Sequence, residues 1–421
     1  MTAPAIRKAV KLWILLSFSP TALSISNLSD SRGSPSNSAQ PRMLTGKRTL
    51  CPDGSGSQKF GYIEVSPITE YFYAAIEADK DPATAPTFIF LRGGPGGSSV
   101  ASAIQMNGPC ISDVVTKRLR LNLYSWTTQA NGVWFDAPAP TGFSVGPVTT
   151  GLEDFILDMI DVITKFTQQN PTFNRNVHLV GLSASAAFVA MLGARLAAKP
   201  QPQVHIVGVM LMSGVVSPID MIAKMTADLG LCDTQIGQCN SNGPGKSPIS
   251  AFCKQAVTAC EDATVRPLEA RKISYYDVRV PSGQEYTKYV LKSSPVDTFL
   301  NNPQIQQELG VSKKWATSND EVYKAYDIYT AYETTPFVVS LLDKGLKFGG
   351  VELGKMRALV YSNQARLAFI KVTEAGHSIV AYKPREVQQG FLAYLSGDLW
   401  KSGWARSSYL GEVCDRDSEM P

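Results

Sequence analysis

The chain has few histidines and almost no excess charge of either sign. Lysine and arginine number 40 against 36 aspartates and glutamates, which gives a formal net charge of +4 over 421 residues. A balance this close argues against a dedicated nucleic-acid or acidic-membrane binder. The histidines are His178, His205 and His377, so a histidine-rich metal site is excluded and a histidine base has three candidates.

Cysteine is scarce as well, and long apolar runs are missing. The seven cysteines include no CxxC pair of the kind that binds zinc or exchanges thiols, and we predict no metal or other cofactor. No stretch approaches the ~20 uninterrupted apolar residues of a membrane span. With 44% hydrophobic residues, the chain instead has enough apolar content for a sizeable core.

Residues 1–24 have the pattern of a secretory signal peptide. Three basic residues precede the apolar run 12–18, and residues 22–24 provide small side chains for cleavage. A single interfacial anchor is the alternative. Residues 25–50 form a flexible polar leader that contains the N-glycosylation sequon Asn27-Leu28-Ser29. We therefore predict a secreted or vacuolar protein that leaves the membrane after signal removal and whose cysteines form disulfides.

Short apolar strands alternate with helical patterns along most of the chain. The strands are predicted at residues 61–65, 71–76, 87–91, 132–135, 177–180, 204–211, 357–361 and 368–372, and the helices at 152–169, 185–198 and 385–395. This alternation predicts an α/β fold with a mostly parallel central sheet buried on both faces. The predicted domain covers residues 51–400 and leaves residues 401–421 as a C-terminal tail.

The sequence pattern changes between about residues 217 and 330. Four cysteines cluster there, at positions 232, 239, 253 and 260, around a polar stretch rich in Gly, Asn, Ser and Pro. We interpret this region as a disulfide-bearing insertion into the sheet, with its pairing left open. Because the total of seven is odd, one cysteine is left free or pairs outside the chain.

Ser183 lies at a predicted strand–turn–helix junction. Its neighbours Gly181, Ala184 and Ser185 are small, as a strained nucleophile elbow requires. The strict G-x-S-x-G pattern fails at its last position, where Ser185 stands. A serine that caps the following helix fits the same residues equally well.

A glycine-rich loop, residues 92–99, follows the predicted strand 87–91 and precedes the serine in the chain. Consecutive glycines let backbone N–H groups turn toward a developing oxyanion, and an acyl-transfer enzyme of the α/β type has such a loop here. A phosphate-binding loop is the alternative, but the loop lacks G-x-G-x-x-G and no lysine follows it. The Gly-Lys-Ser at 245–247 lacks a preceding strand and the first glycine of a P-loop, so we reject a nucleotide site there.

His377 follows a predicted strand near the C-terminus, which is where the chain order Ser…acid…His places a catalytic base. A histidine in an ordinary loop is the alternative. His178 and His205 fall inside or at the start of predicted strands, so we interpret both as structural.

These segments, in this order, resemble the serine carboxypeptidase family, particularly its fungal secreted branch. The resemblance runs from about Cys51 to Leu395. Residues 90–99 resemble the family motif W-L-N-G-G-P-G-C-S-S, and residues 107–110 match N-G-P-C. Residues 124–126 with 130–131 match Y-S-W…A-N, and residues 135–144 resemble D-Q-P-x-G-x-G-F-S. Residues 181–183 occupy the position of the motif G-E-S-Y, and residues 375–377 that of A-G-H-M-V-P.

The resemblance implies an α/β-hydrolase fold with a helical, disulfide-bearing insertion, and a peptide substrate with a free C-terminus. It implies acyl transfer through Ser183, with His377 as general base and then general acid. The backbone N–H groups of Gly94 and Ala184 would form the oxyanion hole.

The chain departs from the family at the residues that bind the substrate's terminal carboxylate. The family uses polar side chains where this chain has Phe90, Arg92, Met106 and Leu182. Arg92 could replace this network by pairing with the carboxylate, in a site that Leu182 keeps dry. Together with Gly93, these two are the candidate substrate-binding residues. The alternative is relaxed selection on an unused pocket.

A second departure concerns the triad aspartate. The family places it after a strand ending in Y-x-G-D, but here that position holds Gln364 at best. The link to the next strand has five or six residues, which suffices for a hairpin or a continuous strand and not for a parallel crossover. Either the homologue is degenerate or the translation skips coding sequence. Glu352 and Glu374 are the other possible acids, without support from their spacing.

Three functions remain open from the sequence. The first is a serine-type carboxypeptidase-like hydrolase that cleaves C-terminal residues from peptides. The second is an inactive homologue that binds peptide or acyl ligands, and the third is an acyltransferase that uses the same serine.

Overall fold

The computed structural model describes residues 49–113, 116, 118–149, 151–218, 230–241, 251–285, 295–352, 357–360 and 366–401. The predicted signal peptide, most of the leader with its sequon, Gln364, Cys414 and nearly all of the predicted tail lie outside these residues.

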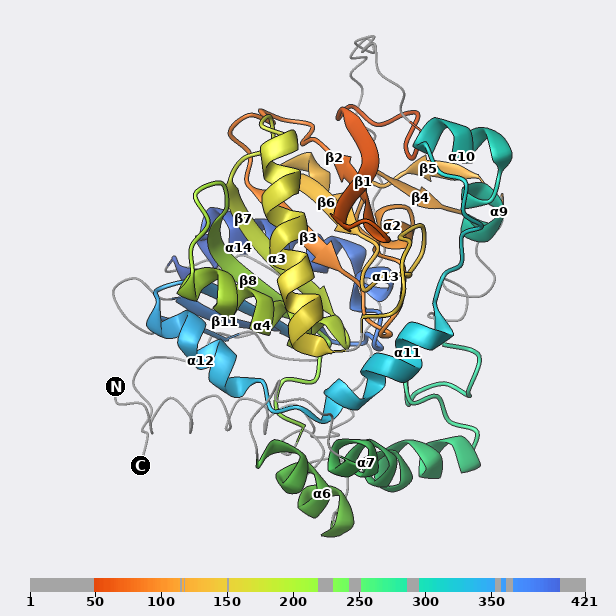
Figure 1. Ribbon diagram of the computed structural model, residues 1–421, viewed down its shortest axis with the longest axis vertical. Coiled ribbons are helices and arrows are strands. Elements are labelled where there is room, and N and C mark those ends of the chain that lie inside the picture. The colour runs from red at the N-terminus through yellow and green to blue at the C-terminus, as the bar shows by residue number, and fades with distance from the viewer. Residues whose placement is uncertain are drawn as a thin grey trace, which may run out of the picture.

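Nine strands form one sheet in the order β1-β2-β6-β3-β7-β8-β9-β11-β10 (Figure 1). The strands are β1 (Gln58–Ser66), β2 (Thr69–Ile76), β3 (Thr87–Leu91), β6 (Asn131–Phe135), β7 (Asn176–Leu182), β8 (His205–Met212), β9 (Lys347–Glu352), β10 (Arg357–Val360) and β11 (Arg366–Lys371). Neighbours from β6 to β11 are parallel, whereas β1, β2 and β10 pair antiparallel at the two ends. Within the described residues a separate small hairpin joins β4 (Cys110–Ser112) to β5 (Leu119–Leu121).

Helices cover both faces of the sheet, which explains why its central strands are apolar throughout. Figure 1 shows α3 (Leu152–Gln169), α4 (Ser185–Ala198) and α12 (Thr335–Asp343) on one side, with α14 (Pro384–Ser396) on the other. Helix α3 buries one face because its apolar residues recur every three or four positions. The predicted α/β-hydrolase fold with a mostly parallel sheet is thus confirmed, and the expected strands and helices lie within a few residues of their predicted positions.

Between β8 and β9 the chain leaves the sheet and forms most of its remaining helices. These are α6 (Gly230–Asn240), α7 (Ala251–Ala270), α9 (Val296–Leu300), α10 (Pro303–Leu309), α11 (Asp320–Tyr326) and the 3-10 helix η2 (Asp327–Ala331). Two nested disulfides, Cys232–Cys260 and Cys239–Cys253, join α6 to α7. The helical, disulfide-bearing insertion is therefore present, and the pairing that the sequence left open is resolved.

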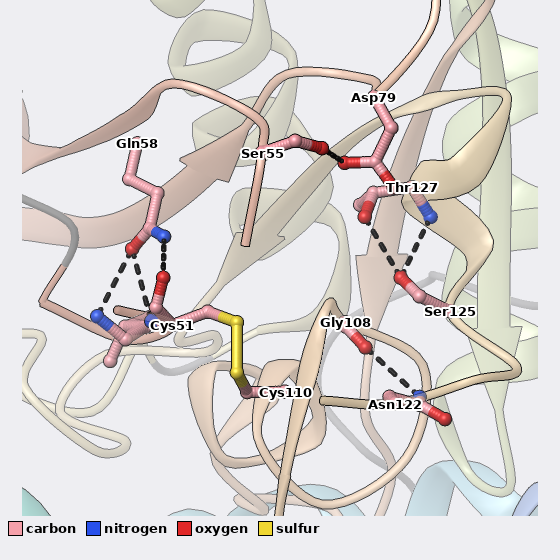
Figure 2. The surroundings of a disulfide bond; sticks show 10 residues. Cys51, Ser55, Gln58, Asp79, Gly108, Cys110, Asn122, Ser125 and Thr127 are labelled. Atoms are coloured by element: carbon pink, nitrogen blue, oxygen red, sulfur yellow. Dashed lines mark hydrogen bonds between the residues drawn. A yellow bond between two sulfur atoms is a disulfide. The ribbon is translucent and has the colours of Figure 1, made fainter. Parts of the chain in front are cut away.

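A third disulfide, Cys51–Cys110, ties the start of the described chain to β4. Figure 2 shows the amide of Gln58 beside it, where the Oε1 atom accepts the N–H of Cys51 and the Nε2 atom donates to the Cys51 carbonyl. The disulfide thereby holds the segment before β1 against β4. Strand β4 in turn lies beside helix α2 (Ser99–Ala103), which follows the glycine-rich loop, since the Ser112 N–H donates to the Ile104 carbonyl just after α2.

The C-terminal end of the sheet has the hairpin that was one of the two arrangements expected of the short link. The strand predicted at 357–361 forms the outer edge as β10, in antiparallel pairing with β11. The short link allows no other pairing. The interior position between β8 and β11 is taken by β9, a strand that the sequence did not predict. Its two glycines hide the strand pattern, and Gly349 allows the Tyr394 ring to approach closely.

The two faces of β11 differ in how well they are covered. Ala368 and Ile370 are fully buried against the α14 side, whereas Leu367 and Phe369 on the other face are only partly buried. A crossover helix between parallel strands would normally cover such a face. The remaining short elements are η1 (Trp126–Thr128), α13 (Ile379–Tyr382) and η3 (Asp398–Trp400). Among the described residues, no helix combines the length and apolar content needed to cross a membrane.

Candidate active site

Ser183 follows β7 directly, in a backbone conformation that residues other than glycine rarely adopt. Its φ is 60°, and its N–H donates to the Met212 carbonyl at the end of β8, 2.8 Å away. A Cβ on Gly181 would lie 2.4 Å from the Ser185 carbonyl oxygen, which explains why this position needs glycine. Strain of this kind at a strand–helix turn is typical of a nucleophile elbow.

His377 lies beside Ser183 although 194 residues separate them in the sequence. Its Nε2 atom is 2.8 Å from the Ser183 Oγ atom, within hydrogen-bond reach. Removal from water lowers the pKa of His377 to about 4. The imidazole is therefore neutral at physiological pH, in the form that can accept a proton from the serine.

The other two histidines have contacts elsewhere. His178 is buried in β7, where its Nδ1 atom lies 3.2 Å from the Tyr394 hydroxyl and burial lowers its pKa to about 3. His205 is exposed at the start of β8, with its Nδ1 atom 2.9 Å from the Asn176 side-chain oxygen. Neither contacts Ser183, which leaves His377 as the base candidate.

The glycine-rich loop packs against the serine. A Cβ on Gly93 would lie 2.6 Å from the Ser183 Cβ and 2.7 Å from the Ala184 nitrogen, so only glycine allows this approach. Gly94 has a φ of 136°, which also favours glycine. The N–H groups of Gly94 and Ala184 donate to no acceptor among the residues that the structure describes. Unused donors beside a nucleophile are the requirement for an oxyanion hole.

Hydrogen bonds from two parts of the chain hold the glycine-rich loop in place. The buried carboxylate of Asp136, at the end of β6, accepts from the Ser98 hydroxyl at 2.7 Å and from the Val100 N–H at 3.1 Å. From the insertion, the Thr317 carbonyl accepts the Ser98 N–H, and the Asn319 N–H donates to the Gly96 carbonyl, both at 2.9 Å. The loop is thus held by the sheet on one side and by the segment before α11 on the other.

Arg92 is buried, with 6% of its surface exposed. Its Nη1 atom donates to the Gln105 side-chain oxygen at 2.9 Å, and its own carbonyl accepts the Ser185 hydroxyl at 2.7 Å. Burial lowers the pKa of the guanidinium to about 10, so it stays protonated at physiological pH. Within the described part of the chain no carboxylate forms an ion pair with it. Leu182, also buried, ends β7 next to Ser183.

No carboxylate among the described side chains hydrogen-bonds the His377 ring. Glu374, one of the two possible acids, is 78% exposed and pairs with Lys383 at 3.0 Å, away from the imidazole. Glu352 ends β9, and its backbone pairs in parallel register with Lys371. No group of three or more His, Cys, Asp or Glu side chains that could hold a metal occurs in the described ranges.

The insertion contributes a contact that the sequence did not predict. The backbone N–H of His377 donates to the Tyr276 carbonyl at 2.8 Å, and the two rings lie 5.3 Å apart between centroids. A chain separation of about a hundred residues and an unremarkable Tyr-Tyr-Asp sequence give no signal from which to infer it. Gln105, the partner of Arg92, carries no motif either.

Three comparisons relate the chain to known proteins. A family model described as serine carboxypeptidase matches residues 52–351. The vacuolar serine-type carboxypeptidase ATG42 of Saccharomyces cerevisiae is 23% identical over 322 residues, covering 69% of this chain and 62% of that protein. Carboxypeptidase Y homolog A of Trichophyton rubrum is 23% identical over 288 residues, covering 63% of this chain and 53% of that protein.

Among solved structures, the prohormone-processing carboxypeptidase KEX1(ΔP) of Saccharomyces cerevisiae has a TM-score of 0.62, at 15% identity, over 84% of this chain and 92% of that one. At this identity the likeness shows the fold alone. The chain spans between about half and three-fifths of the length of the two curated relatives. The family match ends at residue 351, before the β10–β11 hairpin and His377.

Proposed function

The chain belongs to the serine carboxypeptidase family, and from this premise we propose that it hydrolyses the last peptide bond of peptides through an acyl-enzyme on Ser183. The observation that carries the proposal is the 2.8 Å approach of the His377 Nε2 atom to the Ser183 Oγ atom. In this mechanism His377 takes the hydroxyl proton as Ser183 attacks the scissile carbonyl. His377 then gives the proton to the leaving amine, and water releases the peptide in a second, equivalent step.

We assign the oxyanion hole to the backbone N–H groups of Gly94 and Ala184. Their lack of an acceptor among the described residues supports this role, as does the packing of Gly93 on the Ser183–Ala184 turn. Preorganised donors of this kind stabilise the negative charge of the tetrahedral intermediate without moving during the reaction.

We further propose that Ser183 and His377 act as a pair, without a third triad member. Among the described side chains no carboxylate hydrogen-bonds His377, and Glu374 is committed to Lys383. Loss of the acid from a triad costs on the order of 10⁴ in kcat but leaves measurable catalysis. The enzyme is therefore expected to be slow.

Arg92 is proposed to select the free C-terminus of the substrate. A buried, protonated guanidinium without a direct ion pair is unfavourable. The charge of Asp136 offsets this only in part, since the pKa of Arg92 remains lowered, and a substrate carboxylate would compensate the rest. Arginine offers a planar fork of donors that matches a carboxylate, and the dry surroundings of Leu182 strengthen the interaction. Gly93 links Arg92 to the nucleophile turn, which keeps the carboxylate subsite close to the reacting carbonyl.

Replacing Arg92 by leucine is expected to lower kcat/KM for peptides with a free C-terminus roughly 10- to 100-fold, since charge-assisted hydrogen bonds contribute about 1.5–3 kcal/mol each. Peptide amides and esters, which have no carboxylate, should change less than about threefold. Leucine removes a buried charge, so the melting temperature should not fall.

Arg195→Leu is the matched control, because Arg195 is a surface residue that pairs with Glu153 and lies 47% exposed. Equal losses on acids and amides would contradict the assignment of Arg92. Transfer of the acyl group to an added alcohol in place of water would favour the acyltransferase, and binding of peptides without turnover would favour the inactive homologue.

Hydrolysis is expected to persist in mildly acidic solution, with kcat/KM falling to half at a pH of about 4, the lowered pKa of His377. The base works in its neutral form, so activity is present above this pKa and is lost as the pH falls through it. The nearby charges are two internally compensated pairs, Asp277–Arg279 and Glu374–Lys383. A midpoint near the ordinary histidine value of 6.5 would contradict the desolvation of this partly buried base. A pH series with one uncharged ester substrate measures it.

We propose that the protein reaches a vacuole or the exterior through the secretory pathway. The predicted signal peptide and the three disulfides support an oxidising route. One relative is described as vacuolar. Appearance of the tagged chain in a vacuolar or extracellular fraction, and its loss when residues 1–24 are deleted, would test this.

A further inference from the structure

A turn in the insertion, residues 273–282, lies against the loop that carries His377. The turn follows α7 and is closed by backbone hydrogen bonds from the Ser274 N–H to the Val280 carbonyl, at 3.1 Å, and from the Ser282 N–H to the Lys272 carbonyl, at 2.8 Å. These cross-links make the turn a defined structure, so its contacts can fix whatever packs on it.

The contacts between the turn and the histidine loop are close. Besides the 2.8 Å hydrogen bond from the His377 N–H to the Tyr276 carbonyl, the Tyr276 ring lies beside the imidazole. A Cβ on Gly376 would lie 2.9 Å from both the Asp277 Cβ and the Tyr276 carbonyl oxygen. The backbone before His377 is thus packed directly onto Tyr276 and Asp277.

Asp277 organises this turn. Its carboxylate accepts two hydrogen bonds from the Arg279 side chain, both at 2.7 Å, and its N–H donates to the Ser274 hydroxyl at 3.2 Å. The Asp277 side chain is 3% exposed, whereas that of Arg279 is 45% exposed. The guanidinium also lies 5.6 Å from the ring centroid of Tyr382, on the helix that follows His377. Asp277 and Arg279 therefore join the turn to both sides of the histidine loop.

We propose that Asp277 is a positioning residue: through Arg279 and Tyr276 it holds His377 in the orientation that faces Ser183. This inference rests on the proposed function. In a triad, the acid fixes the orientation of the imidazole. Since no described carboxylate hydrogen-bonds this imidazole, the turn supplies the constraint from the backbone and from one face of the ring. A misplacement of about 1 Å at such a site can cost on the order of 10² in rate.

Asp277→Asn is expected to lower kcat about tenfold, with KM unchanged, because the histidine loop loses its support while the substrate site is untouched. The midpoint of the pH profile should rise from about 4 toward the ordinary histidine value of 6.5, as water gains access to the imidazole. Asp277→Asn also leaves the Arg279 charge uncompensated, which by itself would lower the pKa of His377, while the Glu374–Lys383 pair stays intact, so a rise of the midpoint reports hydration of the imidazole. A general loss of folded protein would not move this midpoint.

Two further variants keep the test sharp if Asp277→Asn folds poorly. Gly376→Ala leaves every charge in place but separates the histidine loop from the turn, so it should produce the same fall in kcat and the same shift in midpoint. Arg279→Gln should lower kcat as much as Asp277→Asn does, and the double variant should have a kcat no lower than either single variant. Arg279→Lys, which keeps the charge, should retain more of the wild-type kcat. Asp262→Asn, which breaks an exposed pair with Arg266 on α7, is the control and should behave as wild type.

The readout is steady-state kinetics together with the rate of inactivation by a fluorophosphonate between pH 3 and 8. A reactive wild type whose Asp277→Asn and Gly376→Ala variants keep its kcat and pH midpoint would overturn the positioning role alone. A folded wild type that neither turns over substrate nor reacts with the fluorophosphonate would instead overturn the proposed function, and this inference with it.

Discussion

Ser183→Ala is expected to lower kcat for a peptide substrate about 10²-fold, much less than the loss in a complete triad. Removal of the serine from a complete triad costs on the order of 10⁶, and removal of the acid alone costs on the order of 10⁴. An enzyme that already works without the acid has lost a factor of about 10⁴, so removal of its serine can cost only the remaining factor of about 10². The residual rate would come from the oxyanion hole and substrate binding.

The size of this loss therefore tests two claims together. A fall of about 10⁶ would mean that a carboxylate completes the triad and would contradict the two-residue mechanism. Glu352 would then be the residue to replace, because its backbone ends β9 at the sheet edge where Ser183 and His377 follow β7 and β11. No fall would contradict Ser183 as the nucleophile. Ser241→Ala, an exposed serine at the end of α6, is the control.

His377→Ala should lower kcat by a similar factor of about 10², because the nucleophile and its base act as a unit. For the same reason the double variant with Ser183→Ala should be no slower than either single variant. KM should remain within about threefold, since the imidazole contacts the serine hydroxyl and not the carboxylate subsite proposed at Arg92. The acid limb of the pH profile, which reports the titration of His377, should disappear.

Added imidazole provides a positive test, because a small base can enter the space left by the side chain. We expect it to restore part of the activity of His377→Ala and none of the activity of Ser183→Ala. His205→Ala, at an exposed histidine bonded only to Asn176 in the described structure, is the control. Full activity of His377→Ala would require another base and would contradict the account.

Local patterns in the sequence were sufficient to predict most of the sheet, whereas the pairing of Ser183 with His377 was what the family resemblance implied. The central strands are recognisable because they are apolar along their whole length, as β3 and β6 are. The helix α3 is recognisable from its spacing of apolar residues. Ser183 and His377 were candidates because each follows a strand, and the carboxyl ends of parallel strands meet at one edge of the sheet.

The features that the sequence did not predict depend on contacts between distant segments. β9 contains Gly349 and Gly350, which carry no strand preference, and it is a strand because β8 and β11 pair with it. The support of His377 by Tyr276 and Asp277 depends on where the insertion folds back, which local propensity does not encode. Arg92 was recognised as unusual, but its bond to Gln105 follows only from the folded loop.

The pairing of the insertion cysteines is a case of the same kind. The two disulfides are nested, with Cys232 bonded to Cys260 and Cys239 bonded to Cys253, because α6 and α7 lie side by side (Figure 1). Four cysteines allow three connectivities, and only the arrangement of the two helices selects one.

The central claim is that Ser183 is a nucleophile activated by His377, and covalent labelling tests it most directly. The folded wild-type chain is treated with a fluorophosphonate at neutral pH, digested, and mapped by mass spectrometry. The account predicts one adduct, on Ser183, that is lost in Ser183→Ala and slowed in His377→Ala. An unlabelled folded chain, or an adduct on Ser185, whose hydroxyl is bonded to the Arg92 carbonyl, would contradict it.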